Sequence, residues 1–273
     1  MAITNFIPTI WSENLLTSLN NHYIGVANCN RDYEGEIKQR GSSVKICGVG
    51  DITIGNYAKD TDMSTPQELS DSMMELTIDQ AKYFNFQVDD IDKTQCSPKL
   101  LDAAMRNAAN ALANAADRYI FTLYKDAAKA LEGSLSTDSM IDILLNSREY
   151  LYGNNVTDPA DIVIEISPAV ATKLIKEQAG IFSYNNDILS TGCIGTVAGC
   201  KVFVSNNIAV EDGAIHHCLM RSKRSIAFAE QLSEIEAYRP EKRFADAIKG
   251  LHLYGAKVVY PDELVDIKLS VEA

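Results

Sequence analysis

Three consecutive residues, His216, His217 and Cys218, have side chains that could together bind a metal or act in catalysis. Imidazole and thiolate are common zinc ligands, and a thiolate beside an imidazole is a common nucleophile. A zinc site needs three or four converging ligands, whereas adjacent residues of a strand point to opposite faces of a sheet. The only other histidines are His22 and His252, and the sequence has no CxxC or HExxH spacing. We therefore interpret the three residues as structural, with a metal- or cysteine-dependent enzyme as the alternative of another class.

Other patterns that would indicate catalysis or nucleotide binding are incomplete. The glycines at 48, 50 and 55 do not have the GxGxxG spacing, and those at 192, 195 and 199 lack the Lys-Ser or Lys-Thr ending of a phosphate-binding loop. No GxSxG nucleophile motif is present. The acidic doublet Asp89-Asp90 is of a kind common on protein surfaces. The sequence therefore predicts neither an enzyme nor a cofactor site.

The charge of the chain bears on nucleic-acid binding. The 273 residues carry a net charge of −12, and the sequence pI is about 4.8. Binding to phosphates requires clustered Lys and Arg, because counterion release provides most of that affinity. The densest basic stretch, residues 221–224 (RSKR), is short, and we interpret it as a solvated turn. We expect no sequence-specific DNA binding.

The N-terminal sequence and the cysteines indicate a protein that folds in a reducing compartment. Residues 1–16 lack the basic and apolar regions of a signal peptide, and no apolar run approaches the roughly 20 residues that span a bilayer. The cysteines are scattered, without a CxxC pair, and we expect all of them to be buried, reduced and unreactive. They are Cys29, Cys47, Cys96, Cys193, Cys200 and Cys218.

The first 90 residues indicate an extended region. Within 1–42, apolar residues at 10, 11, 15, 16 and 19 predict one short helix, which would dock on the body of this chain or on a neighbour. Alternating apolar residues at 43–54 and 75–88 predict two strands around a long polar segment, which together form an extended hairpin. Residues 50–75 contain one Lys and six acidic residues, a net charge of −5. This hairpin should project into solvent or onto a basic partner.

Residues 97–132 give the strongest local signal. Ser97 is a good N-cap, Pro98 occupies the first helical position, and Gly133 follows the expected end. The stretch between them is rich in alanine, the best helix former, and could be roughly 50 Å long at 1.5 Å per residue. A helix of this length is expected to act as a strut.

The remaining sequence alternates between helix and strand and then becomes β structure. We expect helices over 137–152 and 167–178, each preceded by a capping residue. Strands are expected at 162–166, 201–204, 215–220 and 226–229, and later at 235–238, 247–259 and 265–271. The alternation predicts a compact mixed α/β domain, followed by strands that return to the first part of the chain.

In the order of its parts the sequence resembles the major capsid proteins of tailed bacteriophages, the Hong Kong 97 phage type of fold. Two stretches carry the resemblance. Residues 194–207 (IGTVAGCKVFVSNN) are similar to the family's glycine-containing turn into a strand that ends in a polar loop. Residues 243–261 (RFADAIKGLHLYGAKVVYP) resemble the closing P-domain strands that precede a YG…V…P ending.

The resemblance implies an α+β fold with an N-terminal arm, an extended hairpin called the E-loop, a P-domain with a long spine helix and an antiparallel sheet, and a mixed α/β A-domain. The arm would span 1–40. The first part of the P-domain would span 41–133, with the E-loop at 48–75 and the spine helix at 97–132. The A-domain would span 134–231, and 232–273 would form the closing strands of the P-domain.

The resemblance also implies a function. Members of the family assemble as hexamers and pentamers into an icosahedral shell that encloses double-stranded DNA. The expected partners are other copies of the chain, a portal and a separate scaffolding protein, because no long helical scaffolding segment precedes the arm. We expect the protein in the virion capsid, assembled in the bacterial host cytoplasm, without a membrane or a cofactor.

The arm and the hairpin supply the expected contacts between subunits, because such extended segments bury little surface within one subunit. We hypothesise that acidic hairpin residues meet basic residues of a neighbour. Some family members crosslink a hairpin Lys to a neighbour's Asn, and Lys59 would be the sole candidate, although a lone exposed Lys is the ordinary case. The contact residues are Trp11, Asp51, Lys59, Asp60, Asp62, Asp71, Arg239, Lys242 and Arg243.

An encapsulin-like nanocompartment shell protein, which has the same fold around cargo enzymes, is the nearest alternative. The polar N-terminal arm favours a phage capsid, because that arm interlaces virion subunits. A cargo-binding inner helix would favour the nanocompartment.

Overall fold

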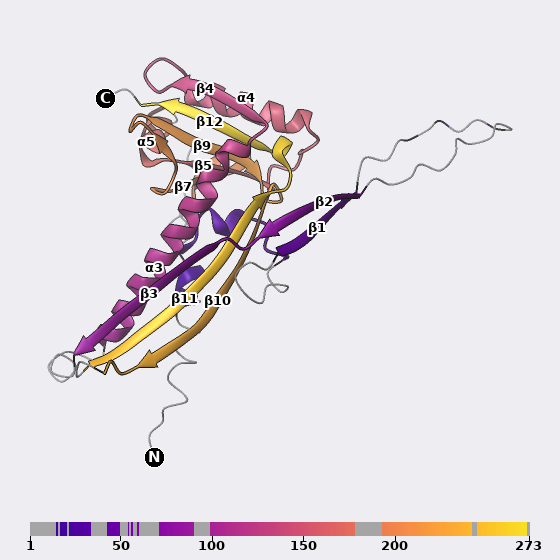
Figure 1. The fold of residues 1–273 in the computed structure, drawn as a ribbon. Helices are drawn as coiled ribbons and strands as arrows, with labels where there is room; N and C mark the ends of the chain where they lie inside the picture. Colours follow the sequence, from indigo (N-terminus) through magenta and orange to yellow (C-terminus); the bar gives the residue numbers. More distant parts are fainter. Residues whose placement is uncertain are drawn as a thin grey trace.

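The structure is a computed structural model of the chain. It describes residues 15, 17–20, 22–33, 43–49, 54, 56, 59, 71–89, 99–177, 193–241 and 245–271. None of the helices in these ranges is long and apolar enough to cross a membrane. The described chain consists of a long three-stranded sheet with a helix along it, a hairpin, and a seven-stranded sheet with two helices (Figure 1).

The long sheet is antiparallel and has the strand order β10-β11-β3. Its strands are β10 (Ile226–Tyr238), β11 (Ala245–Val258) and β3 (Gln80–Asp89). Helix α3 (Lys99–Thr122) runs along one face of this sheet (Figure 1). Ala109, Ala113 and Ala116 of the helix are fully buried, so their small side chains allow the helix to approach the sheet closely. The helix and the sheet share one hydrophobic core.

The hairpin pairs β1 (Ser43–Val49) with β2 (Asp71–Thr77) in an antiparallel register from Ser43↔Thr77 to Val49↔Asp71. It projects from the body of the subunit near the end of the long sheet at which β3 begins (Figure 1). The predicted strand at 75–88 is interrupted at residues 78–79, where the chain turns from the hairpin into β3. The predicted hairpin is therefore confirmed at its base.

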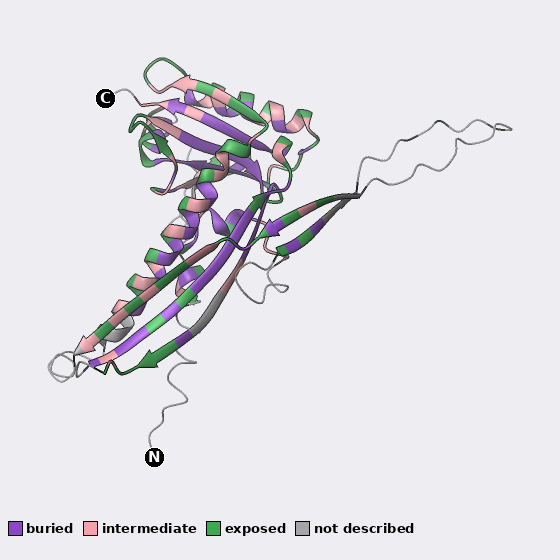
Figure 2. Cartoon of the chain, in the orientation of Figure 1, coloured by how far each residue is buried: buried purple, intermediate pink, exposed green. Residues whose placement is uncertain are grey.

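The seven-stranded sheet mixes parallel and antiparallel pairs in the order β4-β12-β9-β5-β7-β6, with β8 beside β9. Helices α4 (Met140–Gly153) and α5 (Pro168–Glu177) share a hydrophobic core with one of its faces. Figure 2 shows the buried residues concentrated in the central strands β12, β9 and β5. The strands are β4 (Lys129–Ser134), β5 (Ile162–Ile166), β6 (Cys193–Val197), β7 (Cys200–Val204), β8 (Val210–Glu211), β9 (Ile215–Ser222) and β12 (Leu264–Ser270).

Three short 3₁₀ turns lie where the two sheets meet. They are η1 (Val26–Asn28), η3 (Leu123–Asp126) and η4 (Pro261–Glu263). Turn η3 connects α3 to β4, and η4 connects β11 to β12. Turn η1 belongs to the N-terminal segment, which contributes Leu15, Leu19 and Val26 to the core under the long sheet.

The spine helix ends earlier in the structure than the sequence predicted. The helix stops at Thr122, and residues 129–134 form strand β4, which pairs in parallel with β12 from Val265↔Lys129 to Ser270↔Ser134. Helix propensity favoured continuation, but the backbone of 129–134 forms hydrogen bonds with β12, a partner about 135 positions away in sequence that local pattern cannot reveal. Ser97 and Pro98 lie outside the described residues.

The pairing of two strands bears on the expected domain boundaries. Strand β10 begins at Ile226, so residues 226–231, assigned to the A-domain, belong to the long sheet. Strand β12, assigned to the closing strands of the P-domain, lies between β4 and β9 in the seven-stranded sheet. Strand pairing is decided by long-range contacts, and the sequence of β12 is equally suited to either sheet.

Most of the other predicted elements are confirmed. Strand 162–166 is found with its predicted bounds, and the helices predicted at 137–152 and 167–178 occur as α4 and α5. Ser139 precedes α4 at the N-cap position, and the backbone N–H of Met140 donates to Glu177 Oε2 (2.9 Å). The strands predicted at 226–229 and 235–238 are one continuous strand, β10, with a bulge between them.

Candidate functional site: the hairpin, the long sheet and the junction of the two sheets

The base of the hairpin is held by a small hydrophobic cluster. Val44, Ile46 and Leu76 of the hairpin pack with residues of β10 and β11 on the face of the long sheet opposite to α3. Where the chain passes from β2 to β3, a Cβ atom placed on Gly255 would lie 2.2 Å from the carbonyl oxygen of Thr77. The direction in which the hairpin leaves the body therefore depends on close backbone contact at Gly255.

Three of the predicted contact residues fall within the described chain. Lys59 is exposed, Asp71 pairs with Val49 at the outer end of the described hairpin, and Arg239 is exposed directly after β10. The end of β10 lies far from the hairpin (Figure 1). The structure therefore does not bring these residues together within one subunit. Trp11, Asp51, Asp60, Asp62, Lys242 and Arg243 lie outside the described residues.

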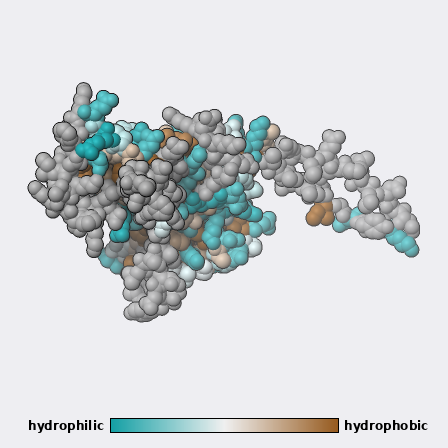
Figure 3. Space-filling view, turned by 90° about the horizontal axis from the view of Figure 1, so that it is seen from below, coloured by the Kyte–Doolittle hydropathy of each residue, from teal (hydrophilic) through white to brown (hydrophobic). Residues whose placement is uncertain are grey.

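The face of the long sheet that carries the hairpin has exposed aromatic and aliphatic side chains farther along. Tyr83 is 78% exposed and pairs across the strands with Leu251, which is 37% exposed. Tyr238 exchanges a hydrogen bond with Asn85 nearby. In the view from below, hydrophilic residues predominate among the coloured atoms, with smaller hydrophobic areas between them (Figure 3). The sheet thus offers a mixed surface that another chain could cover.

Part of the segment expected to form the N-terminal arm packs on the body of its own subunit. Leu15 and Leu19 are 1% exposed, so the short helix docks on the body of this chain, one of the two alternatives that its sequence left open. Asn30 forms a parallel bridge with β10, because its N–H donates to Ile226 O and its carbonyl accepts from Phe228 N. Leu15, Leu19 and Val26 are buried because their apolar side chains complete the core beneath α3.

The basic stretch at 221–224 is also not the solvated turn that the sequence predicted. Arg221 is fully buried on β9 and makes two hydrogen bonds to Glu165 of β5, from Nε and from an NH2 group, each of 2.9 Å. Glu165 is fully buried as well. The sequence held one signal of this ion pair, a carboxylate within the otherwise apolar strand IVIEI. A carboxylate buried in such a strand requires a buried partner.

Asp117 is a further buried residue with an ionisable side chain that the sequence did not predict. It lies in the alanine-rich part of α3 and accepts hydrogen bonds from the backbone N–H groups of Ile24 and Val26, both of 3.0 Å. Burial raises the pKa of Asp117 to about 6, and the hydrogen bonds from the backbone only partly oppose this shift. An aspartate on the buried face of an amphipathic helix was the signal that could have indicated it.

The cluster 216–218 is divided between the two faces of β9. Cys218 lies in the core under α4 and α5, and burial raises the pKa of its thiol to about 12. His217 lies on the opposite face, where its ring stacks on Tyr124 at 3.7 Å between centroids and its Nδ1 is 3.0 Å from Asp266. Among the described residues, no group of His, Cys, Asp and Glu could hold a metal ion. His217 therefore joins β9 to β12 and to the turn after α3.

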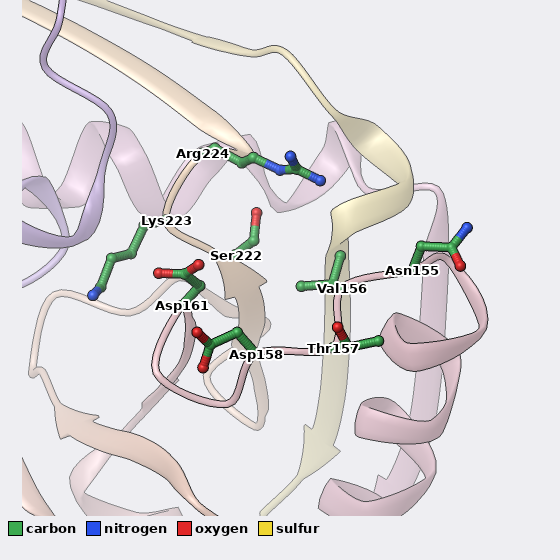
Figure 4. Close-up of a pocket in the computed structure, with 8 residues that line it drawn as sticks. All are labelled: Asn155, Val156, Thr157, Asp158, Asp161, Ser222, Lys223 and Arg224. Carbon is green, nitrogen blue, oxygen red and sulfur yellow. The ribbon is translucent and has the colours of Figure 1, made fainter. Parts of the chain in front are cut away.

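A polar pocket of about 270 Å³ opens beside the junction, between the loop after α4 and the turn between β9 and β10 (Figure 4). Both of its cations interact with groups of the same chain. Lys223 donates to Ala160 O (3.1 Å), and Arg224 pairs with Glu263. These contacts hold the turn in place. The pocket is lined by residues 155–158, Asp161 and residues 222–224.

Comparison with solved structures identifies the fold. The chain is similar to a structure from Mycobacterium phage Che8, with 29% identity, 90% of each chain covered and a TM-score of 0.70. It is also similar to the capsid of Ralstonia phage GP4, with 12% identity, 93% of this chain and 90% of that chain covered and a TM-score of 0.71. The capsid structure of cyanophage P-SCSP1u matches at 15% identity, 86% and 85% coverage and a TM-score of 0.65.

No protein-family model and no curated protein sequence matches the chain. The structural matches extend over most of each chain, so the fold is that of the major capsid proteins of tailed phages. The comparisons do not favour the nanocompartment or the enzyme alternative.

Proposed function

We propose that the chain is the major capsid protein that assembles into an icosahedral shell of hexamers and pentamers around the double-stranded DNA of a tailed phage. The observation that carries this proposal is the match of almost the whole chain to phage capsid structures. The shape of the subunit supports it, because the described strands β1 and β2 project from the body and contact it through the cluster at their base. Such a segment gains stability when it lies across a neighbour.

The parts of the subunit correspond to the domains of this family with adjusted bounds. In our proposal the E-loop is the hairpin that β1 and β2 begin, and the P-domain is the long sheet with spine helix α3. The A-domain is the seven-stranded sheet with α4 and α5, and it includes β4 and β12. The arm is the N-terminal segment outside the anchored residues 15–33.

Contacts between the hairpin and a neighbouring long sheet would hold the shell together. The segment 50–75 has a net charge of −5, whereas Arg239 lies at the end of β10 far from the hairpin of its own subunit. Opposite charges on two separate parts of the sequence favour contact between copies. We expect the acidic residues at 51, 60, 62 and 71 to meet Arg239, Lys242 and Arg243 of the next subunit.

Charge reversal tests this contact. Arg243→Glu or Arg239→Glu should reduce the yield of closed particles, and Lys201→Glu, at an exposed position of the seven-stranded sheet, is the control. Unchanged assembly of both variants would count against the contact. A ladder of bands on a denaturing gel, abolished by Lys59→Arg, would reveal a crosslink through Lys59. We expect no such ladder.

The remaining partners follow from the same role. We propose that the subunits assemble in the cytoplasm of the bacterial host with a separate scaffolding protein and a portal, and that the shell encloses DNA without reading its sequence. The net charge of −12 supports this last point, because an acidic wall does not bind the genome tightly. The chain would have no catalytic role.

Negative-stain electron microscopy of the purified protein, together with its sedimentation profile, tests the function. Closed shells, capsomers, or the rings and tubes of misassembly are the expected result. A protein that stays monomeric or dimeric even with its scaffolding protein present would overturn the proposal.

A further inference from the structure

Buried polar side chains gather where the two sheets of the subunit meet. The chain crosses this junction through the turn after α3, the turn between β9 and β10, and η4 between β11 and β12. Between these crossings lie the fully buried charges of Asp117, Glu165 and Arg221. All three charges converge on one short piece of the N-terminal segment, residues 24–28.

The first anchor comes from the seven-stranded sheet. Besides its two bonds to Glu165, the guanidinium of Arg221 donates to Asn28 O (2.8 Å) and to Gly25 O (2.9 Å). The side chain of Asn28 is part of the same network, because its Nδ2 donates to Ile24 O (3.0 Å) and lies 3.4 Å from Glu165 Oε1. One guanidinium therefore joins two strands of the sheet to two carbonyl groups of the N-terminal turn.

The second anchor comes from the spine helix. Asp117 accepts from the N–H groups of Ile24 and Val26, on the turn whose carbonyl groups face Arg221. A carboxylate on α3 thus binds the donors of the turn, and a guanidinium on β9 binds its acceptors. Each charged group meets the backbone groups of opposite polarity, and such charge-assisted bonds are stronger than neutral ones.

The long sheet supplies a third attachment on either side of the turn. Tyr23 donates its hydroxyl to Glu230 of β10, and Arg31 pairs with the same carboxylate. The backbone of Asn30 bonds to β10 at Ile226 and Phe228. Residues 23–31 are therefore fixed to α3, to the long sheet and to the seven-stranded sheet at once.

We infer that residues 23–31 are a tie that sets the angle between the long sheet and the seven-stranded sheet, with Arg221 and Asp117 as its positioning residues. This inference rests on the proposed function for its consequence. In a shell built from many copies, the angle between the two halves of each subunit sets how neighbours meet, and therefore the curvature of the shell.

The chemistry of the junction suits this role better than an apolar contact would. Hydrophobic contact is non-directional, so two apolar faces can slide with little loss. A buried guanidinium has donors in a fixed fork, and moving it by an ångström leaves buried groups without partners. The tie is thus satisfied at one geometry of the two sheets.

The test compares two conservative Arg→Lys substitutions three residues apart. Arg221→Lys keeps the charge but has too few donors in the required geometry to hold Glu165 and both carbonyl groups. Arg224→Lys changes an arginine whose side chain is 61% exposed and pairs with Glu263, and it serves as the matched control. Particle diameters by electron microscopy and hydrogen exchange at residues 23–31 are measured for both.

For Arg221→Lys we expect faster exchange at residues 23–31 and a broadened or second distribution of particle diameters, with open or tubular forms. Arg224→Lys should give the particles of the unmodified protein. If Arg221→Lys does not fold, Asp117→Asn takes its place in the test. It keeps the ion pair between Arg221 and Glu165 and weakens only the hydrogen bonds between α3 and the N-terminal turn. A single unchanged diameter despite faster exchange at residues 23–31 would overturn the inference.

A separate measurement distinguishes failure of the inference from failure of the proposed function. If the unmodified protein forms no shells even with its scaffolding protein present, the function fails, and the tie is tested in the subunit itself. Spin labels at the exposed positions Tyr83→Cys and Lys201→Cys report the distance between the two sheets. We expect one narrow distribution that Arg221→Lys broadens. An equally narrow distribution in the variant would refute the tie.

Discussion

Substitution of Gly255 tests the contact that sets the direction of the hairpin. A Cβ atom there would lie 2.2 Å from Thr77 O and 3.1 Å from Ile78 Cα, both in the chain that leaves the hairpin. A close contact between carbon and carbonyl oxygen is about 3.3 Å, so Gly255→Ala must displace this backbone by roughly 1 Å. Overpacking of this kind costs about 1–3 kcal/mol. The displaced atoms are backbone and have no alternative rotamer, so we expect a cost in that range.

Gly153→Ala is the matched control, because no atom lies within 4 Å of a Cβ atom at the end of α4. Each substitution also restricts the unfolded chain, which by itself stabilises a protein by about 0.4–1 kcal/mol, and this effect cancels in the comparison. Urea unfolding should therefore show Gly255→Ala to be about 1–3 kcal/mol less stable than Gly153→Ala, with fewer closed particles. Equal stability of the two variants would refute the reasoning.

Three further outcomes are expected. Glu165→Gln, which leaves the buried Arg221 without its counter-charge, should lower the free energy of unfolding by about 3–5 kcal/mol in urea. Lys249→Met, at a pair about half exposed on both sides, should lower it far less, and similar losses would contradict the burial argument. Burial raises the pKa of Asp117 from 3.8 to about 6, so the folded state binds this proton more tightly than the unfolded state does. The protonated carboxyl therefore stabilises the fold below pH 4, and about 3 kcal/mol of this stability is lost as the pH rises through 6. Asp117→Asn should flatten that part of the pH profile of urea unfolding, and an unchanged slope would contradict the assignment to Asp117. The thiol of Cys218, with its pKa raised to about 12 by burial, should resist maleimide at pH 8 in the native protein and react fully in urea, and rapid native labelling would show that the core opens.

The sequence predicted well those elements whose pattern is local. Strand 162–166 is uniformly apolar and bounded by loops, and helix α5 begins at Pro168 after a capping serine, so each signal lies within a few residues of the element. The hairpin followed from two alternating stretches around a polar segment. The prediction for the end of α3 failed because the deciding contact is not local. Residues 129–134 continue a helical composition, and only pairing with β12 makes them a strand.

The candidate contact residues illustrate the same division. Charge and order along the chain placed Asp71 in the hairpin and Arg239 after a strand, but composition could not show that they lie far apart in one subunit. The solvated turn assigned to 221–224 holds a fully buried arginine, because β9 alternates its side chains between the faces and residue 221 falls on the face toward the N-terminal segment.

The sequence by itself determined the hairpin, the strut helix, the alternation that follows and the acidic charge, because propensity, periodicity and composition act over a few residues at a time. The tertiary structure alone decided that β12 joins β4 and β9, that residues 15–33 belong to the body, and that Asp117, Glu165 and Arg221 meet around one turn. Those outcomes depend on pairs of residues separated by tens to hundreds of positions. A buried charge is tolerated only where the fold supplies its partner, so the location of each charge became meaningful once the fold had brought the partners together.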